Sequence, residues 1–178
     1  TPCDLGTYQP NSGQIFCLES SSGTYVSNTG SSSVSDCSEG TYQPNSGQSE
    51  CIDTSPGYFT SSVRASVQTP CLAGSYQPDP GSITCLQADA GYHVPIEGQN
   101  MQTICPAGQY QPQPSSTECL ITNPGEYSSE GSTSPSPCLA GSYQSDSGQS
   151  GCVLADAGYY SSEISSIEQT SCQPGEYQ

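Results

Sequence analysis

The sequence contains no lysine and no tryptophan, and Arg64 is its single strongly basic residue against 17 Asp and Glu residues. The formal net charge is therefore −16 at pH 7. A chain with one such cation cannot neutralise a phosphate backbone, which argues against nucleic acid as a partner. The same lack of cations argues against docking to an anionic membrane surface.

Long apolar runs are also missing. No segment approaches the roughly 18–20 consecutive apolar residues that cross a bilayer, so we expect no membrane span in this segment. Only 31% of the residues are hydrophobic, whereas ordinary globular domains carry about 45–50%. Together with 19 Gly and 15 Pro residues, this composition taken alone would suggest a disordered linker.

The 11 cysteines indicate instead a chain held by disulfides. Such chains are typical of oxidising compartments, so we predict an extracellular or cell-surface location. The cysteines stand at positions 3, 17, 37, 51, 71, 85, 105, 119, 138, 152 and 172, so that a shorter and a longer interval alternate. This is a two-cysteine repeat, as in arrays whose units pack mainly on their neighbours. The predicted repeats are residues 1–36, 37–70, 71–104, 105–137 and 138–171, and residues 172–178 are the start of a truncated sixth repeat.

Glycine and tyrosine follow the same period, and the segment GTYQPNSGQ occurs at residues 6–14 and again at 40–48. In every repeat Gly stands three residues after the first cysteine, Tyr two residues further on, and Gln directly after Tyr; the last such Tyr is Tyr177. We interpret these as structural repeat positions: Gly6, Tyr8, Gly40, Tyr42, Gly74, Tyr76, Gly108, Tyr110, Gly141 and Tyr143.

The residues after each of these tyrosines, Pro, Asn or Asp, Ser and Gly, favour a tight turn and predict a β-hairpin between the two cysteines. The copy at residues 113–115 lacks the Gly, so we expect an altered turn there. The Ser-rich second half of each repeat predicts another, looser hairpin. No segment shows clear helical periodicity. The predicted fold is a small disulfide-rich all-β protein, an elongated tandem array of 34-residue double β-hairpin repeats without a globular core.

Two disulfide registers fit the spacing, one across the shorter intervals and one across the longer intervals. The stronger turn signal lies inside the shorter interval and favours Cys3–Cys17, Cys37–Cys51, Cys71–Cys85, Cys105–Cys119 and Cys138–Cys152. Cys172 would then have its partner outside the chain. One such disulfide contributes only roughly 3 kcal/mol. We therefore expect the tyrosines and the aliphatic residue after each second cysteine to be buried between neighbours: Leu18, Ile52, Leu86, Leu120 and Val153.

The cysteines do not predict a metal centre, because zinc sites use close Cys pairs, often with His. His93, the single His, stands where other repeats have Tyr25, Phe59, Tyr127 or Tyr160, which indicates a packing position. No lysine and no Ser–His–Asp relay suggests catalysis, so we predict no enzyme activity and no cofactor.

Asp89 and Asp156 each precede an Ala-Gly-Tyr segment, where other repeats have Ser or Asn, and we interpret them as turn-capping residues. Weak calcium binding is the alternative. The Ser/Thr-rich second halves are solvated loops or carriers of O-linked sugars. The O-glycosylation candidates are Thr29, Ser31, Ser32, Ser33, Ser61, Ser62, Ser132, Thr133 and Ser134.

The motif Cys-x-x-Gly-[Thr/Ser]-Tyr-Gln-Pro-x-x-Gly-x-x-x-Cys, seen in residues 37–51 and 71–85, resembles ephrin-receptor-like cysteine-rich repeats. These are related in style to tumour-necrosis-factor-receptor modules. The resemblance implies elongated extracellular arrays of short hairpins, and by analogy it supports pairing of the cysteines that bracket each hairpin. Typical members carry a further cysteine where this chain has an aliphatic residue, and the regularity is closer to tandem arrays of microbial or algal surface proteins.

These observations predict an extracellular structural repeat protein that forms a stalk, fibril or surface filament. Its expected partners are copies of itself in a fibril or a longer array, together with glycans. The alternative is a receptor- or adhesin-type module that binds a protein or glycan along one face.

Overall fold

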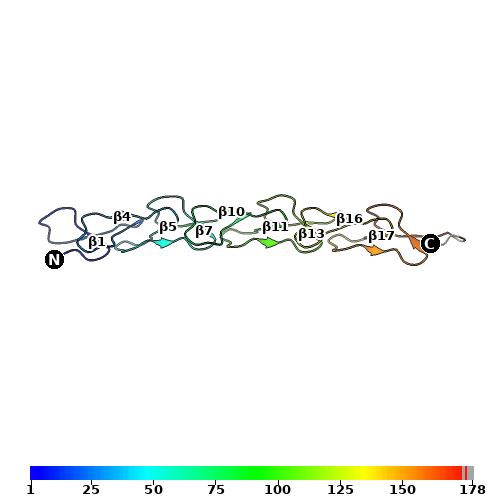
Figure 1. Ribbon diagram of the computed structural model, residues 1–178, viewed down its shortest axis with the longest axis horizontal. Helices are drawn as coiled ribbons and strands as arrows, with labels where there is room; N and C mark the ends of the chain where they lie inside the picture. The colour runs from blue at the N-terminus through cyan, green and yellow to red at the C-terminus, as the bar shows by residue number, and fades with distance from the viewer. Residues whose placement is uncertain (174, 176–178) are drawn as a thin grey trace. The chain divides into compact units, whose positions relative to one another are not determined.

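In the computed structural model, residues 1–173 and residue 175 are described; Tyr177, the last of the repeated tyrosines, lies outside them. Every regular element in this part of the chain is a two-residue β-strand, and no helix occurs in it (Figure 1). Successive strands pair into ten two-stranded sheets. The predicted all-β, disulfide-rich fold of repeated hairpins is confirmed.

The chain divides into two compact units, Thr1–Leu86 with Glu97–Met101, and Gln87–Ile96 with Gln102–Gln178. The first ten strands are β1 (Thr7–Tyr8), β2 (Leu18–Glu19), β3 (Thr24–Tyr25), β4 (Ser35–Asp36), β5 (Thr41–Tyr42), β6 (Ile52–Asp53), β7 (Tyr58–Phe59), β8 (Thr69–Pro70), β9 (Ser75–Tyr76) and β10 (Leu86–Gln87). The remaining strands, all in the second unit, are β11 (Tyr92–His93), β12 (Thr103–Ile104), β13 (Gln109–Tyr110), β14 (Leu120–Ile121), β15 (Glu126–Tyr127), β16 (Ser136–Pro137), β17 (Ser142–Tyr143), β18 (Val153–Leu154), β19 (Tyr159–Tyr160) and β20 (Thr170–Ser171).

The backbone repeats with half the period of the sequence, because β1, β3 and β5 begin at the evenly spaced positions 7, 24 and 41. Tyr8 pairs with Leu18 in the first hairpin, and Tyr25 pairs with Ser35 in the same antiparallel register in the second. The expectation of a looser second hairpin was therefore wrong. The unequal cysteine spacings reflect only that one hairpin of each pair carries the cysteines.

Within each unit, a recurring set of three backbone hydrogen bonds docks one hairpin on the next. In the first unit, the Gly23 N–H donates to the Gln43 carbonyl at 2.7 Å, and the Val26 N–H donates to the Gln48 carbonyl at 3.0 Å. The third bond runs in the opposite direction, from the Gly47 N–H to the Ser20 carbonyl at 2.8 Å. The second unit repeats this set in the bonds Gly108–Ser128, Gln111–Ser132 and Gly131–Cys105. Neighbouring hairpins are thus joined mainly by backbone groups.

The residue that donates this third bond has a left-handed conformation. It is usually Gly, but Arg64, Ser115 and Ser165 adopt φ values of 63°, 59° and 60° there. The turn that lacks Gly is therefore not altered, contrary to expectation. The Ser115 N–H donates to the Ala88 carbonyl at 2.8 Å, and this docking bond holds a conformation that a non-glycine residue rarely adopts alone.

The fourth repeat is one residue shorter because its second hairpin, β15 with β16, has one residue fewer between Tyr127 and Gly131 than its counterparts have. Gly131 keeps a φ of 72° and its bond to the Cys105 carbonyl at 2.9 Å. The deletion is accommodated in the loop, so the docking of the hairpin does not change.

The interior is built of small and polar side chains rather than of large apolar ones. Cys37, Thr24 and Thr54 are fully buried, and the side chain of Gln43 is 2% exposed. The expected burial of the aliphatic residues after each second cysteine was wrong, since Ile52 is 44% exposed and the others are similarly open. The aliphatic side chains that are buried beside the docking bonds are short ones, Val26 and Val94, whereas Ile52 and its counterparts stay exposed.

Arg64 offers the chain's single cleavage site for trypsin, and its turn is bonded on both sides. The Arg64 N–H donates to the Cys37 carbonyl at 2.7 Å, and the Ala65 carbonyl accepts from the Gln43 N–H at 3.0 Å. Cleavage requires local opening of these bonds. We expect the oxidised chain to be cut roughly 100-fold more slowly than the reduced and alkylated chain, as followed by gel electrophoresis. Equal cleavage rates would show that this turn is not held by docking.

Candidate functional site in the cystine hairpins

Five disulfides close alternate hairpins, which we call the cystine hairpins: β1–β2, β5–β6, β9–β10, β13–β14 and β17–β18. The bonds are Cys3–Cys17, Cys37–Cys51, Cys71–Cys85, Cys105–Cys119 and Cys138–Cys152, which is the register of the shorter interval. Their Cα–Cα distances are 5.7–5.8 Å, within the usual range. The first cysteine of each pair is buried and the second is more exposed. Cys172 is half-buried and forms no disulfide with the described residues, and its pairing with a cysteine outside the chain stays a prediction.

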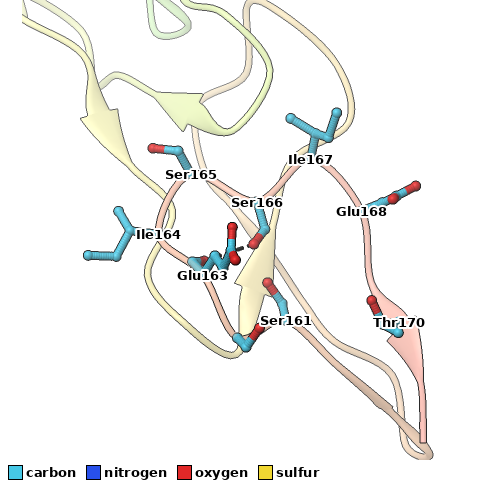
Figure 2. A pocket seen from close by; sticks show the side chains of 9 residues that line it. Ser161, Glu163, Ile164, Ser165, Ser166, Ile167, Glu168 and Thr170 are labelled. Atoms are coloured by element: carbon cyan, nitrogen blue, oxygen red, sulfur yellow. Dashed lines mark hydrogen bonds between the residues drawn. The ribbon is translucent and has the colours of Figure 1, made fainter.

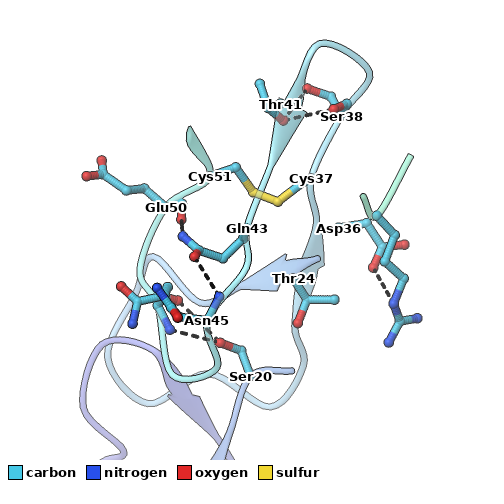
Figure 3. Close-up of a disulfide and its surroundings, with 12 residues drawn as sticks. Ser20, Thr24, Asp36, Cys37, Ser38, Thr41, Gln43, Asn45, Glu50 and Cys51 are labelled. Carbon is cyan, nitrogen blue, oxygen red and sulfur yellow. Dashed lines mark hydrogen bonds and ion pairs between the residues drawn. A yellow bond between two sulfur atoms is a disulfide. The ribbon is translucent and has the colours of Figure 1, made fainter. Parts of the chain in front are cut away.

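A glutamine, buried in four of the five cases, organises the loop of each cystine hairpin. The Gln43 Nε2 donates to the Glu50 carbonyl at 2.8 Å, and the Gln43 Oε1 accepts from the Asn45 N–H at 3.1 Å (Figure 3). The same two bonds recur at Gln9, Gln77, Gln111 and Gln144. This Gln stands directly after every repeated Tyr in the sequence. Its recurrence could have indicated that it stabilises the loop, a role that the sequence analysis does not predict.

Replacing one of these glutamines tests the role. We expect Gln77→Ala to lower the local stability of its hairpin by about 1–3 kcal/mol, because the Asp79 N–H and the Thr84 carbonyl lose their partner. Hydrogen exchange at Asp79 measures this. The exposed Gln14→Ala is the control and should have almost no effect. Unchanged exchange at Asp79 in the Gln77→Ala chain would contradict the assignment.

The other five hairpins have no disulfide, and three of them carry a glutamine at the position of the second cysteine. Gln68 directly precedes β8, as Cys51 precedes β6. Its Oε1 accepts from the Ser55 N–H across the mouth of the hairpin at 2.7 Å. Gln102 and Gln169 bind Asp89 and Asp156 in the same way. In these three hairpins a hydrogen bond joins the two ends of the hairpin, as a disulfide does in the cystine hairpins.

The carboxylates of Asp89 and Asp156 belong to this arrangement. Gln102 Nε2 donates to Asp89 Oδ2 at 2.8 Å, and Gln169 Nε2 donates to Asp156 Oδ2 at 2.7 Å. The interpretation of these side chains as turn caps was wrong, because their carboxylates accept from the glutamine across the hairpin. Both residues lie in turns through their backbone, as shown by the bond from the Tyr92 N–H to the Asp89 carbonyl.

His93 lies against the Cys105–Cys119 disulfide, with Nδ1 3.2 Å from Cys119 Sγ. Among the described residues, this is the one group of three His, Cys, Asp or Glu side chains whose ligand atoms all lie close together, within 4.8 Å. A metal binds the thiolate form of cysteine, and both sulfurs are in the disulfide, so the oxidised chain offers only the imidazole here. Among the described residues no group of three Asp or Glu side chains brings its oxygens together as a calcium site would require.

The O-glycosylation candidates lie in the loops of the hairpins without a disulfide. Seven of the nine are exposed, whereas Ser31 and Ser132 are half-buried. The Ser31 hydroxyl also donates to the Asn28 carbonyl at 2.7 Å. Accessibility therefore permits modification at the exposed seven, and glycosylation itself stays a prediction.

A polar hollow of 410 Å³ lies inside the loop before β20 (Figure 2). Serine, glutamate, isoleucine and threonine side chains line it, and the Ser166 hydroxyl donates to the Glu163 carbonyl at 2.8 Å. None of the lining residues is a His or Lys that could activate a serine. The lining of the hollow therefore offers no imidazole or amine base for a nucleophilic serine.

The exposed surface of the cystine hairpins carries pairs of tyrosine and an aliphatic residue, which we call the tyrosine–aliphatic pairs. Tyr42 is opposite Ile52, and Tyr110 is opposite Leu120. In the hairpins without a disulfide the aromatic residue is instead opposite Ser or Thr, as in Phe59 with Thr69. Apolar and hydroxyl side chains thus alternate from hairpin to hairpin within each unit.

The fold and the site define a class of proteins built from docked two-stranded hairpins, with a disulfide in every second one. Residues 1–37 and 23–71 match the family described as Tyrosine-protein kinase ephrin type A/B receptor-like. The resemblance to ephrin-receptor-like cysteine-rich repeats is thereby confirmed over residues 1–71, and the following repeats keep the same cysteine and glycine positions. Disulfide-rich repeats of this kind are typical of extracellular modules. A search of curated proteins gives no match.

In the part of the chain that the structure describes, no helix has the length and the hydropathy to cross a membrane.

Proposed function

We propose that the chain is an extracellular, non-enzymatic structural repeat protein that forms a stalk, fibril or surface filament. The observation that supports this is the recurrence of the same three docking bonds from hairpin to hairpin within each unit. A specific ligand site usually requires one repeat to differ from the others, whereas a load-bearing array requires them to be alike.

The chemistry of the chain suits such a role. The disulfides close every second hairpin covalently and resist the loss of docked hairpins. The net charge of −16 keeps neighbouring chains soluble. O-linked sugars on the exposed loop residues Ser32, Ser33 and Thr133 would increase the solubility further. The partners in this proposal are copies of the chain itself, in a fibril or in a longer array.

Hydrodynamics and electron microscopy test this proposal. We expect the oxidised chain to sediment with a frictional ratio clearly above that of a compact protein of equal mass, and the reduced chain to lose its fixed shape. In negative stain, filaments should show an axial spacing set by the repeat. A compact monomer with the sedimentation of an ordinary globular domain would overturn the proposal.

The second candidate function is a receptor- or adhesin-type module that binds a protein or a glycan. The tyrosine–aliphatic pairs favour it, because Ile52 and Leu120 are 44% and 42% exposed at equivalent positions and exposed apolar side chains in series are typical of contact surfaces. A stoichiometric partner recovered from extracellular fluid by the monomeric chain would support it. The Ile52→Thr, Leu120→Thr variant copies residues of the neighbouring hairpins and should then lose that partner.

A further inference from the structure

The Cys105–Cys119 disulfide differs from the other disulfides that follow a hairpin in the residue at one equivalent position of that preceding hairpin. The residue that ends the first strand of the preceding hairpin is His93 at this disulfide, whereas it is Tyr25 before Cys37–Cys51, Phe59 before Cys71–Cys85 and Tyr127 before Cys138–Cys152. Only the histidine can accept and return a proton near neutral pH. The Nδ1 atom of His93 is 3.2 Å from Cys119 Sγ, which is within reach of a reaction at that sulfur.

We propose that Cys105–Cys119 is a thiol-exchange site, at which a low-molecular-weight monothiol forms a mixed disulfide with Cys119, and that His93 is the proton acceptor. Cys119 is the more exposed partner of this disulfide, because it is half-buried whereas Cys105 is fully buried. An incoming thiol therefore attacks Cys119. The buried Cys105 is the leaving group.

The exchange is balanced without any external oxidant. As the thiol sulfur approaches Cys119 Sγ, the imidazole of His93 takes the thiol proton, because the thiolate is the attacking form. The new sulfur–sulfur bond forms at Cys119, and the electron pair of the old bond goes to Cys105 Sγ. The imidazolium lies within 4.8 Å of that sulfur and returns the proton to it. One thiol and one protein disulfide thus become one mixed disulfide and one protein thiol.

The fold explains why such a site would be selective. A nearby imidazolium stabilises a thiolate that otherwise forms in buried surroundings at a high cost. At the three comparable disulfides, tyrosine or phenylalanine provides no such stabilisation. The Cys105–Cys119 hairpin would therefore open first when extracellular thiols rise, while its neighbours keep their disulfides.

The experiment uses the full oxidised chain with Cys172 blocked by N-ethylmaleimide. Glutathione is added under native conditions, and acid-quenched samples are alkylated and mapped by mass spectrometry. We expect the glutathione adduct on Cys119, with alkylated Cys105, to appear roughly tenfold faster than adducts at Cys51, Cys85 or Cys152, which is less than a well-placed general base can contribute. Equal rates at all four disulfides, or an adduct on Cys105 instead, would overturn the proposal.

Two reciprocal variants separate the chemistry from a mere loosening of the hairpin. His93→Phe copies the residue at the equivalent position 59 and should reduce exchange at Cys119 to the rate at Cys85. Phe59→His should raise exchange at Cys85 by a similar factor. If His93→Phe only weakened packing, exchange at Cys119 would accelerate. Acceleration, or no change in either variant, contradicts the role of His93.

Discussion

Replacing Gly40 by alanine should destabilise its part of the array by roughly 2–5 kcal/mol, the sum of a backbone and a packing penalty. A Cβ atom at Gly40 would overlap with the Gly81 carbonyl oxygen, which belongs to the hairpin two positions further along. Its φ of 80° adds about 1–2 kcal/mol of backbone strain for a non-glycine residue, and forced overpacking adds about 1–3 kcal/mol or more. Chemical denaturation combined with hydrogen exchange at Gly40 and Thr54 measures the loss.

Gly141→Ala is the matched control. Gly141 occupies the same position of its hairpin, with a φ of 88°, but no heavy atom of the described residues lies within 4 Å of its added Cβ. This variant should therefore show only the backbone penalty of about 1–2 kcal/mol. The difference between the two variants isolates the close approach of backbones. Equal losses in both would mean that the close approach at Gly40 has no energetic weight.

Removal of one disulfide should have the second largest effect. The paired change Cys71→Ala, Cys85→Ala opens a loop whose ends have a sequence separation of 14, and we expect a loss of about 3 kcal/mol from its hairpin. Exchange at the Gly98 N–H is a direct local probe, because that group donates to the Cys71 carbonyl at 2.8 Å. An array of this kind need not unfold in one step, so a residue-level probe is preferable to a single melting temperature.

The hairpins closed by glutamine provide the comparison for this experiment. Gln102→Ala removes a tie that is solvent-exposed and made of hydrogen bonds to Asp89. The expected loss is about 1 kcal/mol or less. If both variants accelerated exchange in their hairpins equally, the disulfide would stabilise no more than the polar tie, and the covalent closure would not be a main source of order.

Much of the fold is predictable from the sequence because cysteine and glycine recur in it at fixed spacings. The spacing of Cys37 and Cys51 encloses a turn sequence, and a hairpin there follows from the chemistry of Pro, Asn and Gly. The docking of hairpins is not predictable in this way. It is made by N–H and C=O groups, which every residue except proline presents alike, so residues such as Val26 and Gln48 do not reveal the pairing in which they take part.

The polar interior is likewise not predictable from the sequence. The recurrence of Gln43 is visible in the sequence, but a glutamine after tyrosine on a short strand is compatible with exposure, and only the fold buries it. Conversely, Ile52 has the character of a core residue and is exposed, because close backbone docking fills the interior first. Ser115 keeps its turn for a similar reason, since its neighbour determines its conformation.

The docking of hairpins through backbone groups has a consequence for how such a gene can change in length. Successive hairpins present nearly the same donors and acceptors at both faces, as the equivalent bonds of Gly23, Gly57 and Gly108 show. Unequal recombination can therefore add or remove a hairpin pair without requiring a new interface to evolve. Selection on such an array would act on the length of the chain and on its loops, while the interfaces between hairpins stay equivalent to one another.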